Sequence, residues 1–169
     1  LSYVIDVYRD STTCQKSVIK LALYISFFSQ LIAGPIVRYK DIESQLSNRT
    51  IHIDQIAIGI ERFFWGFSKK ILLANNLSIV ADGIYSNLPD NLNHPTLLWI
   101  ASICYSLQIY FDFSGYSDMA IGLANIFGFN FQENFNYPYV SKSVTEFWRR
   151  WHISLGQWFK DYVYIPLGG

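Results

Sequence analysis

Apolar and charged positions alternate along this chain in long blocks, and the first block predicts a membrane helix. Residues Leu21 to Val37 form a run of 17 positions without a charge, which ends at Arg38. At about 1.5 Å of rise per residue, this run is at the short end of a membrane span of about 20 residues. We expect a helix here that stops at Pro35, followed by a polar loop from Arg38 to Arg49.

The second block predicts an amphipathic helix. Its apolar positions recur every three or four residues and are Ile53, Ile56, Ala57, Ile60, Phe64, Phe67 and Ile71. Charged residues occupy the rest of the helical wheel, namely Asp54, Glu61, Lys69 and Lys70. We expect this helix to lie at a membrane interface and to continue as a further helical segment from Ile71 to Tyr85. Ser86 to Pro95 is then a turn-rich loop.

The third block is the most membrane-like part of the chain. Residues 91–132 contain only two charges, Asp112 and Asp118, in 42 positions. This length allows two helical crossings or one long kinked crossing. We expect a break at Gly115, since glycine weakens a helix interior by about 1 kcal/mol relative to alanine.

The last block mixes aromatic and charged residues and predicts a third amphipathic helix. Ser143, followed three positions later by Glu146, forms a capping box that starts a helix. One apolar stripe along this helix contains Val144, Phe147, Trp148, Trp151, Leu155, Trp158, Phe159 and Tyr162. His152 falls at the edge of that stripe, between apolar and polar surroundings.

The composition supports a membrane protein. The 169 residues are 51% hydrophobic, 18% aromatic and 15% charged, against about 25% charged in ordinary soluble domains. The formal net charge is zero, so nothing attracts nucleic acid, and no nucleic-acid partner is expected. Cys14 and Cys104 lack metal-ligand spacing, so we predict no metal and no bound cofactor. We expect an all-α, polytopic membrane protein with interfacial amphipathic helices and re-entrant or broken helices.

The two aspartates of the apolar block are candidates for lining a polar cavity. A carboxylate at the middle of a membrane helix costs roughly 2.5 to 3.5 kcal/mol, so it must be hydrated, protonated or paired. At 100° per residue, Ser114, Ser117 and Asp118 share one helix edge, whereas Asp112 points elsewhere. The alternative is that both aspartates cap backbone N–H groups at an interfacial helix break.

His152 is the candidate catalytic residue. Modest burial would keep its imidazole neutral near pH 7 and able to take a proton from a substrate hydroxyl. The alternative is a structural histidine at the membrane interface, with one ring nitrogen bound to a carbonyl.

Several runs of the sequence together resemble the membrane-bound O-acyltransferase family, and within it the bacterial alginate O-acetylation branch. These runs are LIAGPIVRY (31–39), YFDFSGYSDMAIG (110–122), NFNYPY (134–139), FWRRWHISL (147–155) and DYVYIPLGG (161–169). They cover nearly the whole chain, and their combination is far more specific than any single run.

The resemblance implies a multi-pass O-acyltransferase of the bacterial cell inner membrane. Such an enzyme moves acetyl from a cytoplasmic donor, acetyl-CoA or another acyl thioester, toward hydroxyls of an exported polysaccharide such as alginate. Its expected partners are the lipid bilayer, the acyl donor, the polysaccharide acceptor and extracytoplasmic acetyltransferase proteins. The resemblance also assigns His152 to the catalytic site and Trp151 to the lining of a tunnel. Arg149 or Arg150 could contact donor phosphates, and either arginine could instead be an interface anchor.

The family's catalytic base is a histidine on a later membrane helix, and no histidine follows His152 here. The chain also begins with Leu1 rather than methionine. We therefore expect residues 1–169 to be the central part of one acyltransferase domain, in a parent chain that continues beyond both ends. Alone, this part should be inactive.

Two hypotheses from other functional classes remain open on the residues alone. The chain could be a membrane transport or conduction element with Asp112 and Asp118 along its path. It could also be a non-catalytic scaffold that docks an extracytoplasmic acyltransferase partner. Turnover of an acyl donor by the full-length protein separates the enzyme from both.

Overall fold

The computed structural model describes residues 1–28, 34–87 and 94–169, and within these ranges the chain forms helices and no strands. Three short helices come first: α1 (Ser2–Tyr8), α2 (Val18–Ser26) and α3 (Tyr39–Asn48). A long helical hairpin follows, with two shorter helices, α8 (Val144–Arg150) and α9 (Ile153–Phe159), near the C-terminus. A 3-10 turn (Pro138–Val140) precedes α8, whereas a π-helical turn (Lys160–Tyr164) and a 3-10 turn (Ile165–Leu167) follow α9.

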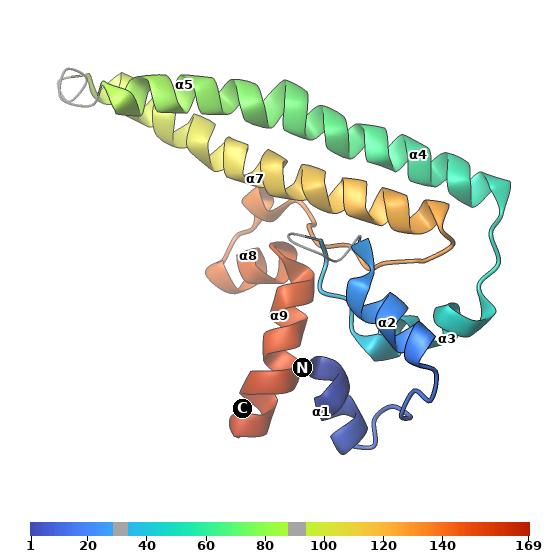
Figure 1. Ribbon diagram of the computed structural model, residues 1–169. Helices are drawn as coiled ribbons and strands as arrows, with labels where there is room; N and C mark the ends of the chain where they lie inside the picture. Colours follow the sequence, from blue (N-terminus) through green and yellow to red (C-terminus); the bar gives the residue numbers. More distant parts are fainter. Residues whose placement is uncertain (29–33, 88–93) are drawn as a thin grey trace.

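The hairpin is the largest feature of the fold. Its first arm is continuous and consists of α4 (Ile53–Ser68), a π-helical segment (Lys69–Ala74) and α5 (Asn75–Ser86). Its second arm is α7 (Pro95–Ile126), which runs antiparallel to the first along its whole length (Figure 1). The amphipathic helix predicted from Ile53 and its continuation are thus confirmed. Most of the predicted loop between the arms lies outside the described residues.

Four glycines bring α4 and α7 into backbone contact. A Cβ built on Gly115 would lie 2.7 Å from the carbonyl oxygen of Gly66, and one on Gly122 would lie 2.6 Å from the carbonyl oxygen of Gly59. The two contacts are seven residues apart on each helix, so they repeat after two turns on the same faces. Small residues permit such close packing of helices in membranes. The contacts fix the register of the hairpin.

The predicted break at Gly115 is wrong, because α7 is one continuous helix of 32 residues that includes Gly115. Gly115 does not break the helix; its missing side chain permits the close packing of α7 against Gly66 of α4. Among the described residues, α7 is the one helix long and apolar enough to cross a membrane, and only 6% of its apolar window is buried within the protein. Of the two alternatives left open for this block, the described part forms one long helix, without the expected break.

The apolar stripe of α4 faces away from the rest of the protein. Ile53 and Phe64 expose 81% and 60% of their surface, whereas the buried positions of α4 are Gly59 and Gly66. Exposed apolar side chains also follow the other parts of the hairpin, including Leu72, Ile79, Trp99 and Ile103. An apolar surface this extensive is typical of a protein that contacts lipid.

A smaller core lies beneath the end of the hairpin and changes two predictions. It contains Tyr24, Phe27, Val37, Tyr39, Ile42, Leu46, Ala124 and Phe129. The helix predicted from Leu21 to Pro35 is wrong, since α2 ends at Ser26, Phe27 is extended and residues 34–38 are not helical. Residues 29–33 of the predicted span lie outside the described residues. The predicted loop from Arg38 to Arg49 is also wrong. Tyr39, Ile42 and Leu46 form the buried face of α3, and burial of this face stabilises a helix despite many polar neighbours.

The C-terminal region is two helices rather than one. The hydroxyl of Ser143 accepts a hydrogen bond from the backbone N–H of Glu146, so the predicted helix start is confirmed. The predicted single stripe is wrong, because α8 ends at Arg150 and His152 adopts a left-handed conformation before α9 begins. The chain then returns to α1, where the hydroxyl of Tyr162 donates to Asp6 at 2.6 Å (Figure 1).

A Gly66→Ala variant tests the helix contact. Its Cβ would overlap the carbonyl oxygen of Gly115, so the helices must separate, and we expect the free energy of unfolding to fall by about 1–3 kcal/mol. The measurement is the Tm of the detergent-solubilised protein. Gly83→Ala on α5 is the matched control, because its Cβ meets nothing within 4 Å and alanine favours the helix. Equal Tm values for both variants would contradict the contact.

Candidate functional site

A polar cavity of about 460 Å³ lies between α4, α7 and the segment 133–137. Its wall combines two cations, two carboxylates, two serines, two tyrosines and two asparagines. The lining residues are Arg62, Lys69, Tyr110, Ser114, Ser117, Asp118, Glu133, Asn134, Phe135, Asn136, Tyr137 and Ile153. The predicted edge of Ser114, Ser117 and Asp118 therefore faces this cavity.

Ion pairs hold Asp118 within the apolar helix α7. Its carboxylate accepts from Arg62 at 2.9 Å and from Lys69 at 2.5 Å, and Arg62 also pairs with Glu133. The two cations and two carboxylates cancel, so the cavity is polar without net charge. The alternative capping role is wrong for Asp118, because this residue lies within a continuous helix and pairs with cations from α4 and the π-helical segment.

Three buried polar atoms in the cavity wall have no hydrogen-bond partner among the described residues. They are the hydroxyls of Ser114 and Ser117 and the amide nitrogen Nδ2 of Asn134. These side chains are almost fully buried, with 2%, 2% and 1% of their residue surface exposed. An unpaired buried polar group costs about 1–3 kcal/mol, so this cavity favours a polar molecule that can bond to them.

The break between α8 and α9 places His152 beside the cavity. Its backbone is left-handed, with φ 46° and ψ 55°, which is uncommon for a residue other than glycine. Two backbone hydrogen bonds of 2.9 Å flank it: Asn136 donates to Arg150, and Ile153 donates to Asn134. The segment 134–136 thus stabilises the unfavourable conformation.

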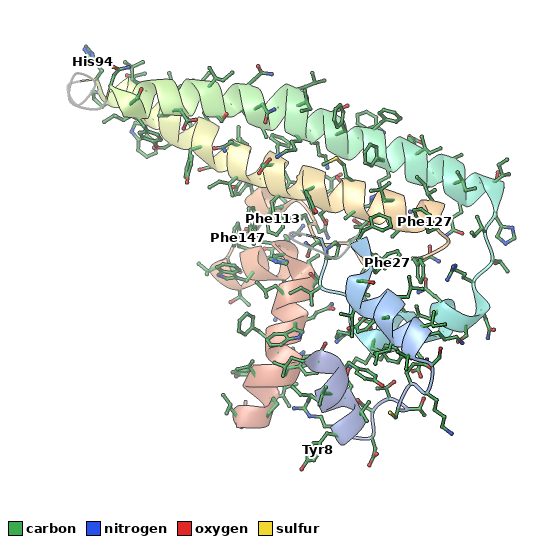
Figure 2. All side chains as sticks on the ribbon, viewed as in Figure 1. Tyr8, Phe27, His94, Phe113, Phe127 and Phe147 are labelled. Atoms are coloured by element: carbon green, nitrogen blue, oxygen red, sulfur yellow. The ribbon has the colours of Figure 1, made fainter. Side chains whose placement is uncertain are left out.

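The imidazole of His152 is half-buried against aromatic rings. The ring of Phe113 meets it edge-on with centroids 4.9 Å apart, and Phe135 stacks at 6.5 Å. Figure 2 labels Phe113 of α7, near α8 and α9. Burial lowers the pKa of His152 below its ordinary value, so the imidazole is neutral at pH 7. Its Nδ1 lies 3.1 Å from Oδ1 of Asn134. A base held by its second nitrogen and a structural histidine would both make this contact.

His152 contacts the cavity wall through Asn134 but does not line the cavity, and neither do the remaining predicted residues Asp112, Arg149 and Trp151. Asp112 pairs with Lys70 on a more exposed part of α7. It lies within the continuous helix, so the alternative capping role is also wrong for Asp112. Trp151 packs in an aromatic cluster, with ring centroids 5.1 Å from Phe135 and 5.6 Å from Phe147. Figure 2 labels Phe147 on α8.

Arg149 lies on a second, larger depression. This groove of about 860 Å³ runs along α8 and α9 and is lined by Thr145, Trp148, Arg149, Ile153, Gly156, Gln157, Lys160 and Tyr164. Ile153 borders both the groove and the polar cavity, and His152 precedes it in the chain. Arg150 instead binds Glu146 at 2.8 Å, so the two neighbouring arginines differ in surroundings.

Sequence reasoning missed Arg62 and Asn134 as site residues. Arg62 sits between Gly59 and Gly66, as Asp118 sits between Gly115 and Gly122. Two helices with the same glycine spacing and opposite charges between the glycines are the signal that could have paired them. Asn134 offered no such signal beyond its place in the run NFNYPY.

Known proteins match this chain over all the residues of the site described above. The model of MBOAT, the membrane-bound O-acyltransferase family, matches residues 13–169. The probable alginate O-acetylase AlgI of Pseudomonas aeruginosa is 50% identical over 171 aligned residues, which cover all of this chain and 32% of that protein. The peptidoglycan O-acetyltransferase of Helicobacter pylori is 43% identical over 153 residues, covering 88% of this chain and 28% of its own.

A more distant relative is the teichoic acid D-alanyltransferase of Bacillus subtilis, 34% identical over 151 residues that cover 86% of this chain and 37% of that protein. The chain spans about a third of the length of the curated relatives that it matches. These matches confirm the predicted resemblance, including its alginate O-acetylation branch. The chain therefore belongs to the membrane-bound O-acyltransferase family.

Proposed function

We propose that this chain is the central part of a membrane-bound O-acyltransferase that transfers acetyl toward hydroxyls of an exported polysaccharide such as alginate. The observation that carries the proposal is the polar cavity with buried, unpaired hydrogen-bonding groups beside the neutral imidazole of His152. The names of the similar alginate and peptidoglycan O-acetylating proteins support this substrate class. The enzyme is multi-pass and acts in the bacterial inner membrane, together with extracytoplasmic acetyltransferase partners.

The arrangement suits acyl transfer to a hydroxyl. This reaction needs a group that takes the hydroxyl proton and donors that stabilise the oxyanion, in a place where water is excluded. Phe113 and Phe135 cover the imidazole of His152, and Nδ2 of Asn134 is a donor without a partner among the described residues. His152 therefore acts at the reacting centre, and the family's later histidine completes the site.

The groove along α8 and α9 is our proposed entry for the acyl donor. Arg149 and Lys160 give it two cations, which suit the phosphates of acetyl-CoA. Ile153 separates the groove from the polar cavity, so a thioester reaching past this residue would approach His152. The same groove would accept another acyl thioester with a phosphate group.

The donor site is tested with Arg149→Ala in the full-length enzyme. We expect the KM for acetyl-CoA to rise several-fold with kcat nearly unchanged, since the arginine binds a part of the donor that does not react. With acetyl-pantetheine, which lacks phosphates, the variant should match the wild type. An equal KM for acetyl-CoA in variant and wild type would leave Arg149 as an interface anchor.

The role of His152 is tested with His152→Ala in the full-length enzyme. We expect polysaccharide O-acetylation to fall by about a hundredfold or more, because an aligned group in a dry site is worth roughly 3–4 kcal/mol in the transition state. Membrane levels should stay near normal, and they are measured in the same cells. His52→Ala is the control, since His52 is exposed at the start of α4. Activity of His152→Ala within a few-fold of wild type would support the structural alternative.

The polar cavity is tested by comparing Asp118→Asn with Asp112→Asn. The first variant leaves Arg62 and Lys69 with Glu133 alone and gives the cavity a net positive charge. We expect acetyl transfer to fall at least tenfold for Asp118→Asn and less than threefold for Asp112→Asn, because Asp112 lies outside the cavity. The measurement is the initial rate in membranes with matched protein levels. Equal losses of acetyl transfer in the two variants would argue against a role of the cavity in the reaction.

A further inference from the structure

Two hydrogen-bond donors of Ser154 and a ring nitrogen of His152 converge on one buried oxygen. Oδ1 of Asn134 lies 3.2 Å from the backbone nitrogen of Ser154, 2.8 Å from the hydroxyl oxygen of Ser154 and 3.1 Å from Nδ1 of His152. Asn134 and Ser154 are both buried, with 1% and 7% of their surface exposed. The cluster therefore has a fixed geometry within the protein interior.

The backbone of Ser154 identifies the amide atom as oxygen. A backbone N–H can only donate, so an acceptor must face it, and a flipped amide would place two donors against each other. The hydroxyl of Ser154 accepts from the backbone N–H of Ile36 at 3.0 Å. Its own proton is then directed to Oδ1 of Asn134, where the distance is shortest.

Among the described residues, these assignments leave only acceptors around Nδ1 of His152. One is Oδ1 of Asn134 at 3.1 Å, and the other is the hydroxyl oxygen of Ser154 at 3.4 Å, whose proton is already engaged. Nδ1 must therefore carry a hydrogen. A neutral imidazole has a single N–H, so its Nε2 has a free lone pair and can only accept.

We propose that Asn134 is a positioning residue that holds His152 as the Nδ1–H tautomer, so that Nε2 accepts a hydrogen bond from the acceptor hydroxyl. This inference rests on the proposed function. This hydrogen bond orients the hydroxyl toward the acyl carbon, and the later histidine of the family serves as the base.

The charged groups on the surrounding elements are engaged with one another. They are Asp112 with Lys70, Asp118 with Arg62 and Lys69, Glu133 with Arg62, and Glu146 with Arg150. Arg149 lines the neighbouring groove, and Tyr110 and Tyr137 line the cavity. A neutral amide thus orients the ring, whereas a carboxylate in its place would favour the imidazolium.

The test uses full-length enzyme and two readouts. The first is the ¹⁵N spectrum of histidine-labelled protein, with the His152 signals assigned by difference from His152→Gln. We expect the neutral wild-type ring to show a protonated Nδ1 and a bare Nε2. The second is the pH profile of kcat and KM for acetyl-CoA.

Two substitutions of Asn134 separate orientation from packing. Asn134→Asp keeps the acceptor but adds charge, so it should retain the tautomer and move the acid limb of kcat upward by about one pH unit or more. Asn134→Ala should lower kcat tenfold or more, leave KM within about twofold and mix the tautomers. Ser154→Ala is the matched control, because it preserves the contact of Asn134 with Nδ1 and should keep both the tautomer and the acid limb.

A protonated Nε2 in the neutral wild-type ring would overturn the proposal, as would an unmoved acid limb in Asn134→Asp. If Asn134→Ala does not accumulate, the wild-type spectrum and the pH profile of Asn134→Asp still test the proposal. Failure of the proposed function has a different signature. A full-length protein without acetyl transfer would refute the function, while the spectrum would report the tautomer independently of activity.

Discussion

The close approach of α4 and α7 at their glycines is the contact on which the site depends. Side chains at Gly66 and Gly115 would hold the helices apart, and the antiparallel register would lose its fixed points. With this register, Arg62 and Lys69 reach Asp118 from the opposite helix. The cavity opens where these polar residues meet the segment 133–137. Backbone contact thus determines the chemistry of the cavity wall.

The same hairpin must satisfy two opposite environments. Its outer face exposes Phe64, Leu72 and Trp99, which lipid solvates well. Its inner edge holds Arg62, Lys69 and Asp118, which form an ion-pair network with Glu133 of the segment 133–137. Charges of equal number and opposite sign make burial of that edge tolerable, because each ion has a partner in place of water. The hydroxyls and the amide are different, since no described residue bonds to them and a polar molecule in the cavity could do so. This asymmetry is what separates a binding site from a structural ion-pair network.

Sequence periodicity predicted the features that arise within one helix. The start of α4, the cap at Ser143 and the shared edge of Ser114 and Asp118 follow from local spacing alone. The failures arise where tertiary contacts override local preference. Gly115 reads as a helix breaker until Gly66 is placed opposite it, and α3 reads as a loop until its buried face is known. No local pattern distinguishes the break at His152 from a continuous amphipathic helix.

That break has a functional consequence which a continuous helix could not provide. In one helix, His152 would stay on the edge shared with Thr145 and Arg149, away from Asn134. The left-handed backbone instead turns the imidazole toward Phe113, and the backbone bonds of the segment 134–136 compensate a conformational cost of about 1–3 kcal/mol. The same segment supplies the amide that orients the ring. The runs around Asn134 and His152 therefore work as one unit, because neither places the imidazole without the other.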